Sequence, residues 1–345
     1  MQQRANRRPA LGRTVVTGAA GFIGSHLVES LLADGTTVVG VDRRAPHLDS
    51  VAAANLGRVL GDPNFTLITA DLRTCPLTAI FRQADAVFHL AALPGVRDSW
   101  GERFTEYASC NIFATERVVA ACEDARVPRL VYASSSSVYG TSSRATREVT
   151  TPNPASPYAV SKLAGEQLCL AHAGSARSEL TAVALRLFTV YGPRQRPDML
   201  IGRALTAALG GPELTLYGDG SHTRDFTYVG DVVRAAIAAA TRRIETTVLN
   251  VGAGVSTSVL EVLSAVEELS GRAVPVTRLP AQAGDVDATL ADRSQAAALL
   301  DWAPRTTLVQ GIAHQLSYLT ADASAKRNAQ GGARRRERTE GLTPR

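Results

Sequence analysis

The chain has 345 residues, 45% of them hydrophobic and 20% charged, which is the composition of a globular protein. The net charge of +5 does not indicate a nucleic-acid partner, because much of it lies in arginines near the two ends, where we expect a disordered arm (1–12) and a disordered basic tail (320–345). No apolar run approaches the ~20 residues of a membrane span. The four scattered cysteines form no metal-ligand pair, so we expect reduced thiols, no metal and a cytoplasmic protein.

Short apolar runs alternate with longer segments of helical period from Thr14 onward. Because the runs are apolar throughout, they predict parallel strands buried on both faces. The expected fold class is α/β, a Rossmann-type doubly wound parallel sheet. The expected strands span 14–17, 37–41, 65–68, 86–90, 129–132 and 182–186, and a late strand over 247–251 could rejoin this sheet.

Glycine and proline pairs break the alternation after about Tyr191, and a second irregular region runs from about 256 to 318. We interpret these pieces, about 189–224 and 256–319, as a smaller C-terminal α/β lobe that binds substrate. The cofactor-binding domain then comprises 13–188 and about 225–255.

A glycine-rich turn, Gly18-Ala-Ala-Gly21-Phe-Ile-Gly24, follows the first strand and opens a helix. Glycines there permit a tight turn and close approach of a diphosphate to free N–H groups at the helix start. Asp42 ends the second strand, where a carboxylate accepts hydrogen bonds from a ribose 2′-hydroxyl and repels a 2′-phosphate. NAD is therefore favoured. The two arginines that follow keep NADP open, since an arginine can pair with a phosphate, or Arg43 could stack on adenine.

Further cofactor contacts are expected where the third and fourth strands end. Asp71 could hydrogen-bond adenine or be an ordinary loop aspartate. The small residues after His89 let a dinucleotide lie against the backbone, while His89 itself, inside an apolar strand, is more typical of a packed core histidine than of a base. The expected cofactor-binding residues are Gly18, Gly21, Phe22, Ile23, Gly24, Asp42, Arg43, Asp71, Leu72, Leu90, Ala91, Ala92, Tyr158 and Lys162.

Tyr158 and Lys162 lie four residues apart at the start of a helical pattern, so they share one helix face. A nearby ammonium and a positive nicotinamide ring would both favour the phenolate of a tyrosine whose ordinary pKa is about 10. Alone, this spacing is typical of a surface pair; after the glycine turn it predicts a catalytic base. A serine-rich loop, 134–137, follows the fifth strand at the edge where doubly wound sheets bind ligands.

Together, the glycine turn, the serine loop and Tyr158-x-x-x-Lys162 resemble the extended short-chain dehydrogenase/reductases, and more narrowly their nucleotide-sugar epimerases and dehydratases, over about residues 13–318. By alignment on Tyr139-Gly140, the resemblance implies that Ser135 is the catalytic hydroxyl. It also implies a homodimer joined through a four-helix bundle.

The residues after Ser135 distinguish the branches of this family. Dehydratases carry Asp-Glu where this chain has Ser136 and Ser137, and decarboxylating enzymes usually carry a glutamate at the second position. Both reactions are therefore disfavoured. Segments 90–97, 188–199, 284–286 and 291–292 instead resemble UDP-glucuronate 4-epimerases, and Gln282 stands where galactose epimerases carry an arginine. Two departures are Gly230, where the family has an acid, and the residues 98–100.

The resemblance also assigns substrate contacts. A sugar carboxylate would suit the hydroxyls of Ser136, Ser137 and Thr189 with Arg196 nearby, although Arg196 could be a surface loop arginine. It further implies that Arg224 reaches the UDP diphosphate, with Tyr217 near the uracil and Asp285 near the uridine ribose. The expected substrate-binding residues are Arg97, Ser136, Ser137, Thr189, Arg196, Tyr217, Arg224 and Asp285.

The implied activity is NAD-dependent 4-epimerisation between UDP-glucuronate and UDP-galacturonate. Tyr158 would take the C4 hydroxyl proton through or beside Ser135, and the hydride would pass to NAD and return to the other face of a transient 4-keto sugar. Two alternatives stay open: a 4-epimerase of neutral UDP-hexoses (UDP-glucose or UDP-N-acetylglucosamine), and a protein that binds NAD without turnover.

Overall fold

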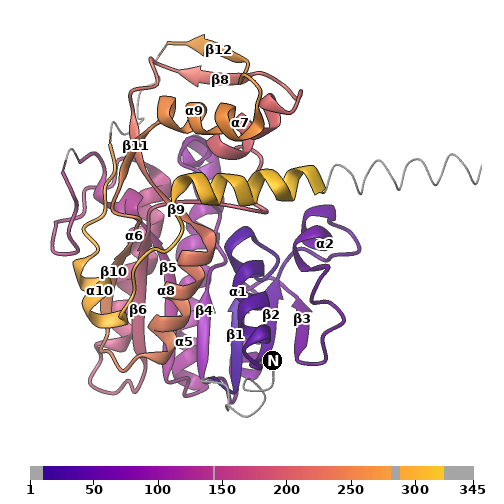
Figure 1. Ribbon diagram of the computed structural model, residues 1–345. Helices are drawn as coiled ribbons and strands as arrows, with labels where there is room; N and C mark the ends of the chain where they lie inside the picture. Colours follow the sequence, from indigo (N-terminus) through magenta and orange to yellow (C-terminus); the bar gives the residue numbers. More distant parts are fainter. Residues whose placement is uncertain (1–10, 143, 281–287, 322–345) are drawn as a thin grey trace, which may run out of the picture.

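The computed structural model describes residues 11–142, 144–280 and 288–321 (Figure 1). Gln282, Asp285 and most of the two terminal arms, for which the sequence carries predictions, lie outside these ranges. Among the described residues, no helix combines the length and the hydropathy needed to cross a membrane.

A seven-stranded sheet forms the centre of the larger domain, with strand order β10-β6-β5-β4-β1-β2-β3. All of its neighbouring strands pair in parallel, so the doubly wound α/β prediction is confirmed. The late strand rejoins the sheet as predicted, next to β6. The strands are β1 (Arg13–Thr17), β2 (Thr37–Asp42), β3 (Phe65–Thr69), β4 (Ala86–His89), β5 (Arg129–Ser135), β6 (Thr181–Leu187) and β10 (Thr247–Val251).

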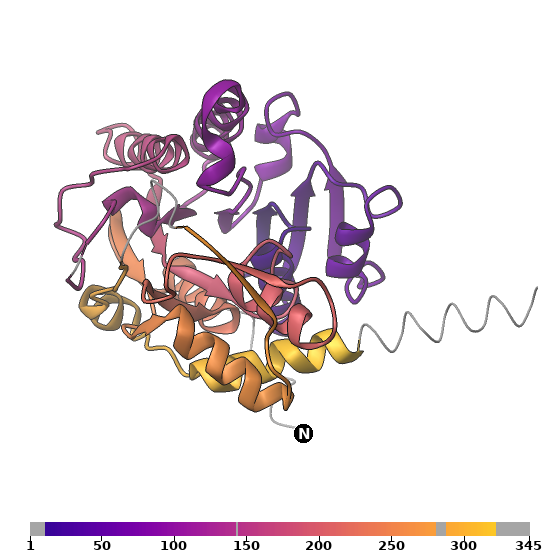
Figure 2. The same cartoon turned by 90° about the horizontal axis from the view of Figure 1, so that it is seen from above.

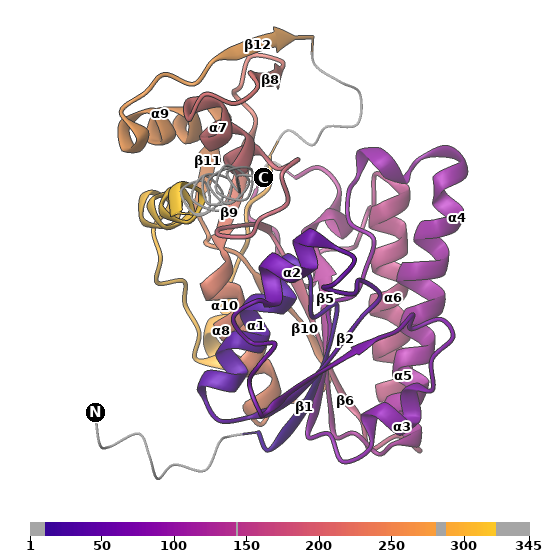
Figure 3. The ribbon, with the colours of Figure 1, turned by 90° about the vertical axis from the view of Figure 1, so that its right-hand side faces the viewer.

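Helices cover both faces of this sheet (Figure 3), which explains why its strands are apolar throughout. One apolar core lies under α1 (Phe22–Ala33), α2 (Ser50–Leu56), α8 (Val229–Thr241) and α10 (Ser294–Leu300). The other lies under α3 (Leu77–Phe81), α5 (Ala114–Asp124) and α6 (Pro157–Ala173). A short helix α4 (Phe104–Tyr107) and a π-helix η4 (Ala108–Phe113) run directly into α5. Short 3₁₀ turns are η2 (Arg97–Ser99), η3 (Gly101–Arg103) and η5 (Ser136–Tyr139).

The smaller lobe stands over the carboxyl ends of the main strands (Figure 1). It holds α7 (Leu200–Ala208), α9 (Val259–Ser270), the parallel pair β8 (Leu214–Tyr217) and β12 (Val276–Leu279), and the sheet β11 (Ser256–Ser258), β9 (Thr223–Tyr228) and β7 (Thr189–Tyr191). A helix over 308–321 packs against it. Figures 2 and 3 show the lobe on the α1 and α8 side, away from α5 and α6.

Two segments cross the boundary that the sequence suggests between the domains. Strand β9 pairs with β7 and β11 rather than with the main sheet. Conversely, α10 and Trp302 pack into the core of the main sheet, and the Trp302 indole donates a hydrogen bond to the Asp231 carbonyl oxygen (2.9 Å). The chain therefore passes between the two bodies more often than its glycine and proline pattern suggests.

Candidate functional site

The glycine turn lies between the ends of β1, β2 and β4. Gly18 has a φ of +72°, and a Cβ there would stand 2.8 Å from the Ala91 backbone nitrogen. A Cβ on Gly24 would collide with the Gly18 carbonyl oxygen, so α1 can begin this close to the turn only with glycine at both positions. Gly21, Phe22 and Ile23 form the start of α1. The result is a cradle of bare backbone at a helix N-terminus, which fits a diphosphate.

Asp42 lies at the end of β2, beside this cradle. Its carboxylate accepts hydrogen bonds from the backbone N–H of Ala20 (3.0 Å) and of Arg44 (3.0 Å), and Arg44 also forms an ion pair with it (3.4 Å). Arg43 lies 4.0 Å from Glu106 of α4. Both arginines that would favour a 2′-phosphate thus have a carboxylate neighbour, and the acidic Asp42 is held where a ribose hydroxyl is expected.

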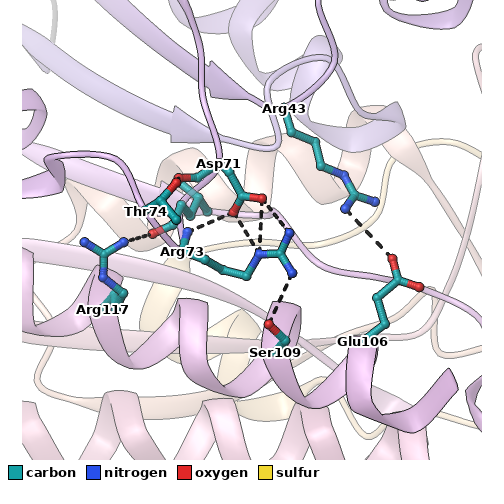
Figure 4. Close-up of polar contacts among 8 residues, drawn as sticks. Arg43, Asp71, Arg73, Thr74, Glu106, Ser109 and Arg117 are labelled. Atoms are coloured by element: carbon teal, nitrogen blue, oxygen red, sulfur yellow. Dashed lines mark hydrogen bonds and ion pairs between the residues drawn. The ribbon is translucent and has the colours of Figure 1, made fainter. Parts of the chain in front are cut away.

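Figure 4 shows the polar contacts around Asp71, at the end of β3. The Arg73 guanidinium donates to both of its carboxylate oxygens (2.6–3.1 Å), and these hydrogen bonds lower the pKa of Asp71 to about 2. Arg73 also donates to Ser109 of η4 (3.2 Å), and Arg117 donates to the Leu72 carbonyl oxygen. An adenine contact from this carboxylate would therefore be shared with Arg73, a residue that the sequence did not indicate.

His89 is a core histidine, as the sequence indicates. Its side chain is fully buried, with Nδ1 2.7 Å from the Thr17 hydroxyl and Nε2 3.0 Å from the Thr115 hydroxyl. Burial lowers its pKa to about 3, so it stays neutral. The following residues, Leu90 to Ala92, lie beside the glycine turn, where Ala91 donates its N–H to the Thr17 hydroxyl (3.3 Å).

Helix α6 begins where the chain carries its start signals. The Ser156 side chain accepts a hydrogen bond from the Ala159 N–H (3.2 Å), and Pro157 occupies the first turn. Lys162 is buried, its Nζ lies 4.2 Å from the centre of the Tyr132 ring, and burial lowers its pKa to about 7. Tyr158, one turn earlier, begins the face that points to the serine loop.

The electrostatics of Tyr158 differ from the sequence expectation. Burial raises its pKa, whereas a side-chain hydrogen bond with Ser135 and the positive charge of Arg196 work in the opposite direction. The expected ammonium effect is thus exerted on the phenol by Arg196, while the Lys162 ammonium faces the Tyr132 ring. Tyr158 thus contacts Ser135, and Arg196 is close enough for its charge to act on the phenol.

The serine loop is bonded to a buried ion pair between Arg186 and Glu166. Strand β5 continues through Ser135, whose hydroxyl accepts a hydrogen bond from the Ser137 N–H (3.2 Å) at the start of η5. Ser134 donates to the Glu166 carboxylate (2.6 Å), which also receives two hydrogen bonds from Arg186. Neither Glu166 nor Arg186 was predicted from the sequence, because neither belongs to a recognisable motif there.

Asn111 and Tyr107 are further residues that the sequence reasoning missed. Asn111, buried in the π-helix, accepts from the Leu93 N–H (2.7 Å) and donates to Ser161 on α6 (3.0 Å). Tyr107 packs edge-on against Tyr158, with ring centres 6.3 Å apart. An interrupted helix carrying a buried polar residue is typical of functional sites, but a π-bulge leaves no local signal in the sequence.

The expected substrate residues fall into separate groups. Arg97 of η2 stacks over the ring of Tyr217 at the end of β8, with its Cζ 4.8 Å from the ring centre. This contact joins the larger domain to the lobe. Arg196 is one-third exposed and pairs with Asp198 (2.8 Å). Arg224 lies on β9, where it donates to the Thr223 carbonyl oxygen (2.8 Å). Among the remaining expected residues, Ser136 and Ser137 lie in η5, Thr189 begins β7, and Asp285 is outside the described residues.

Comparison with known proteins gives consistent results. Residues 14–252 match the NAD dependent epimerase/dehydratase family. A Bacillus subtilis protein described as an uncharacterized UDP-glucose epimerase, YtcB, is 42% identical over 313 residues, 90% of this chain and 98% of that protein. The structure of MoeE5 with UDP-glucuronic acid and NAD has a TM-score of 0.84 at 46% identity, covering 90% of this chain and 100% of that one. UDP-glucuronic acid 4-epimerase from Bacillus cereus, with UDP-glucuronic acid and NAD, has a TM-score of 0.85 at 38% identity, covering 90% and 99%.

Proposed function

This chain belongs to the NAD-dependent epimerase/dehydratase family, and on that premise we propose that it interconverts UDP-glucuronate and UDP-galacturonate. The family makes it an NAD-dependent nucleotide-sugar 4-epimerase, an isomerase. The identity of the sugar is the part that rests on the geometry described above.

The observation that carries the proposal is the position of Arg196. Its positive charge lowers the pKa of Tyr158, and we infer from this that the guanidinium faces the sugar carbon at which the proton and the hydride move. A carboxylate on the neighbouring C5 of a glucuronate would meet this guanidinium. The hydroxyls of Ser136, Ser137 and Thr189 supply hydrogen-bond donors of the kind that a carboxylate needs.

The chemistry that bound NAD would supply is reversible hydride transfer at C4 of the sugar, with no net change in the cofactor. The glycine cradle would hold its diphosphate, and Asp42 would hold its ribose. Tyr158 takes the proton of the C4 hydroxyl through or beside Ser135 and gives it back after the 4-keto sugar has turned over in the site. Arg196 supports the phenolate during this step because a positive charge lowers the pKa of Tyr158.

The carboxylate creates a chemical hazard, since the 4-keto form of a glucuronate is a β-keto acid that readily loses carbon dioxide. That loss requires the bond to the carboxylate to align with the carbonyl π system. Hydrogen bonds from Ser136, Ser137 and Thr189, together with the Arg196 charge, keep the carboxylate out of this alignment. Arg224 binds the UDP diphosphate, and Tyr217 with Arg97 binds near the uracil.

The direct test incubates purified protein with UDP-glucuronate, without added NAD, and separates the products. We expect UDP-galacturonate, and little UDP-4-keto-pentose. At a pH above the acidic limb of the profile, where the Tyr158 pKa no longer limits the rate, an Arg196→Ala variant should lower kcat/KM for the acidic sugar by ~10–100-fold, the effect of one charged hydrogen bond, and leave a neutral sugar within about threefold. Equal losses for both sugars, or a 4-keto-pentose as the main product, would contradict the proposal.

The second candidate is a 4-epimerase of neutral UDP-hexoses. It is favoured by the name of the Bacillus subtilis relative, a UDP-glucose epimerase, and by a second MoeE5 structure that contains UDP-glucose and NAD. Turnover of UDP-glucose or UDP-N-acetylglucosamine with no conversion of UDP-glucuronate would select this function.

A homodimer is proposed on the same premise. Phe113, the last residue of η4, and Val160 of α6 are exposed apolar side chains, and α5 and α6 lie on the side of the molecule away from the lobe (Figure 3). A shallow apolar groove beside Phe113 also involves Ile112 and Leu168. Equilibrium sedimentation should give twice the chain mass, and Phe113→Glu should give monomers. A cytoplasmic location fits the four free cysteines.

A further inference from the structure

Arg194 lies in the loop between β7 and α7, two residues before Arg196, and its side chain turns away from the site toward α1. Its φ is +65°, a conformation that is strained for any residue with a Cβ. The side chain is nonetheless 7% exposed, far less than the one-third of Arg196. A buried arginine in a strained loop indicates that its contacts determine the loop conformation.

These contacts involve two helices of the cofactor domain. Arg194 donates from both Nη atoms to the Glu29 carboxylate of α1 (2.8 and 2.7 Å), which makes a bidentate ion pair. It donates from Nη1 to the Asn55 carbonyl oxygen on α2 (2.8 Å). It also donates from Nη2 to His26 Nδ1 (2.8 Å).

His26 completes the connection with its other nitrogen. Its Nε2 lies 2.8 Å from the Pro193 carbonyl oxygen, so a neutral ring donates there and accepts from Arg194 at Nδ1. Burial and the Arg194 charge lower the pKa of His26 to about 4, which favours this neutral form. Two successive residues of the loop are thereby bound to one side chain of α1.

The network continues to the glycine turn. Asn55, whose carbonyl oxygen accepts from Arg194, donates through its side chain to the carbonyl oxygen of Ala20 (2.9 Å). The Ala20 N–H is the group that donates to Asp42. A continuous set of hydrogen bonds therefore joins the loop that carries Arg196 to the cradle for the cofactor diphosphate.

The direct partner of Arg196 does not hold it in place. Asp198 is 65% exposed, and an exposed ion pair contributes little. The backbone around Arg196 is fixed through its neighbours: Arg194 binds the cofactor domain, and the Gln195 side chain accepts a hydrogen bond from Gln315 of the 308–321 helix (3.0 Å). The loop is thus held from both bodies of the protein.

We propose that Arg194 is a positioning residue that sets where Arg196 stands relative to Tyr158, and that it controls the preference for an acidic sugar without touching the sugar. The part concerning sugar preference rests on the proposed function. The part concerning Arg196 and Tyr158 does not, because it applies to whichever UDP-sugar the enzyme turns over.

The test compares Arg194→Met, Arg196→Ala and the double variant. Arg129→Met is the control, since this half-buried arginine likewise joins separate segments, by donating to two carbonyl oxygens, but lies at the opposite end of the sheet. We measure kcat and KM as functions of pH, the affinity for UDP alone and the amount of bound NAD. Glu29→Gln provides a milder second variant that removes only the charge partner.

If Arg194 acts through Arg196, Arg194→Met reproduces most of the effect of Arg196→Ala. The acidic limb of the kcat profile moves to higher pH in both, because a lost positive charge raises the pKa of Tyr158. For UDP-glucuronate, kcat/KM falls ~10-fold or more, the double variant is no worse than Arg196→Ala, and UDP affinity and bound NAD are unchanged. Glu29→Gln shifts the profile in the same direction by less.

Three results would overturn the proposal. They are additive losses in the double variant, an Arg194→Met profile identical to that of Arg129→Met, or an equal loss of UDP and NAD binding, which would mean a general folding defect. If Arg194→Met does not fold, an unshifted profile in Glu29→Gln has the same force. A shared pH shift without any discrimination between acidic and neutral sugars would refute the UDP-glucuronate assignment while supporting the positioning role.

Discussion

The Arg186 guanidinium and the Glu166 carboxylate form a buried two-pronged ion pair (2.6 and 3.0 Å) directly behind the loop that carries Ser135. Arg186 lies on β6 and Glu166 on α6, one turn after Lys162. The guanidinium also stacks on the Tyr139 ring, 4.6 Å from its centre. One ion pair thereby joins β6 to α6 behind the end of β5, where the proposed catalytic residues Ser135 and Tyr158 lie.

Removing one partner of this pair should strongly destabilise the fold. We expect Glu166→Ala to lower the free energy of unfolding by about 3–5 kcal/mol, because it leaves a buried guanidinium uncompensated. Glu106→Ala is the control: its ion pair with Arg43 is half-exposed and 4.0 Å long, and should change stability by less than about 1 kcal/mol. Urea denaturation measures the free energy of unfolding of both variants. Similar losses in the two would contradict a structural role for the buried Arg186–Glu166 pair.

Lys162 predicts a pH dependence of stability. Its pKa is lowered to about 7 by burial, so between pH 7 and its unfolded value of 10.5 the unfolded chain binds more protons at this site than the folded chain. Stability contributed by this group therefore rises with pH across that window. We compare the native chain with Lys162→Met, both freed of cofactor. Between pH 6.5 and 9.5, the free energy of unfolding of the native chain should rise by about 2–4 kcal/mol more than that of the variant. If the difference in unfolding free energy between the two proteins stays constant with pH, the Lys162 ammonium is solvated in the folded chain.

The glycine turn should not tolerate a methyl group at Gly24. The new Cβ collides with the Gly18 carbonyl oxygen, so we expect Gly24→Ala to lose NAD and about 1–3 kcal/mol of stability. Gly61→Ala has open space around its Cβ and should retain both. Absorbance of released cofactor and thermal unfolding provide the measurements; a Gly24→Ala protein with its full NAD content would be inconsistent with this packing.

Asp42 should decide between the two dinucleotides. Asp42→Ala removes the ribose acceptor and frees Arg44, so the affinity for NAD should fall ~10-fold and that for NADP should rise. Asp49→Ala, which removes only the cap of α2, should affect neither. Calorimetric titration with each dinucleotide distinguishes the outcomes, and unchanged NADP binding would mean that Arg43 and Arg44 do not face a 2′-phosphate.

Tyr158→Phe should abolish proton transfer at C4. We expect kcat to fall by ~10²–10⁴-fold with NAD still bound. Tyr107→Phe keeps the edge-on ring contact and loses only a hydrogen bond to the Pro94 carbonyl oxygen (3.0 Å), so its kcat should fall by less than about tenfold. Product formation by each variant checks this, and full activity without the Tyr158 hydroxyl would remove it from the mechanism.

The main sheet was predictable because each of its strands is a continuous apolar run, a signal that is complete within a few residues. The glycine turn and the Tyr158–Lys162 spacing are local in the same sense. Glu166, Arg186 and Arg194 could not be found this way, because their roles arise from partners 20 to 168 residues away. The charge of Arg196 on Tyr158 was not foreseen for the same reason: Lys162 is near in sequence, whereas Arg196 lies in the loop after β7.

The return of β10 to the edge of the main sheet has a consequence for synthesis of the chain. Strand β6 pairs with β5 on one side, but its other partner is made some 60 residues later, after most of the lobe's first segment. Asn250 of β10 also receives the hydrogen bond of the Tyr139 hydroxyl (2.7 Å), beneath the serine loop. A nascent chain that ends before residue 251 therefore exposes an apolar edge strand on the ribosome, and such edges aggregate. The serine loop acquires this support only after β10 has been made.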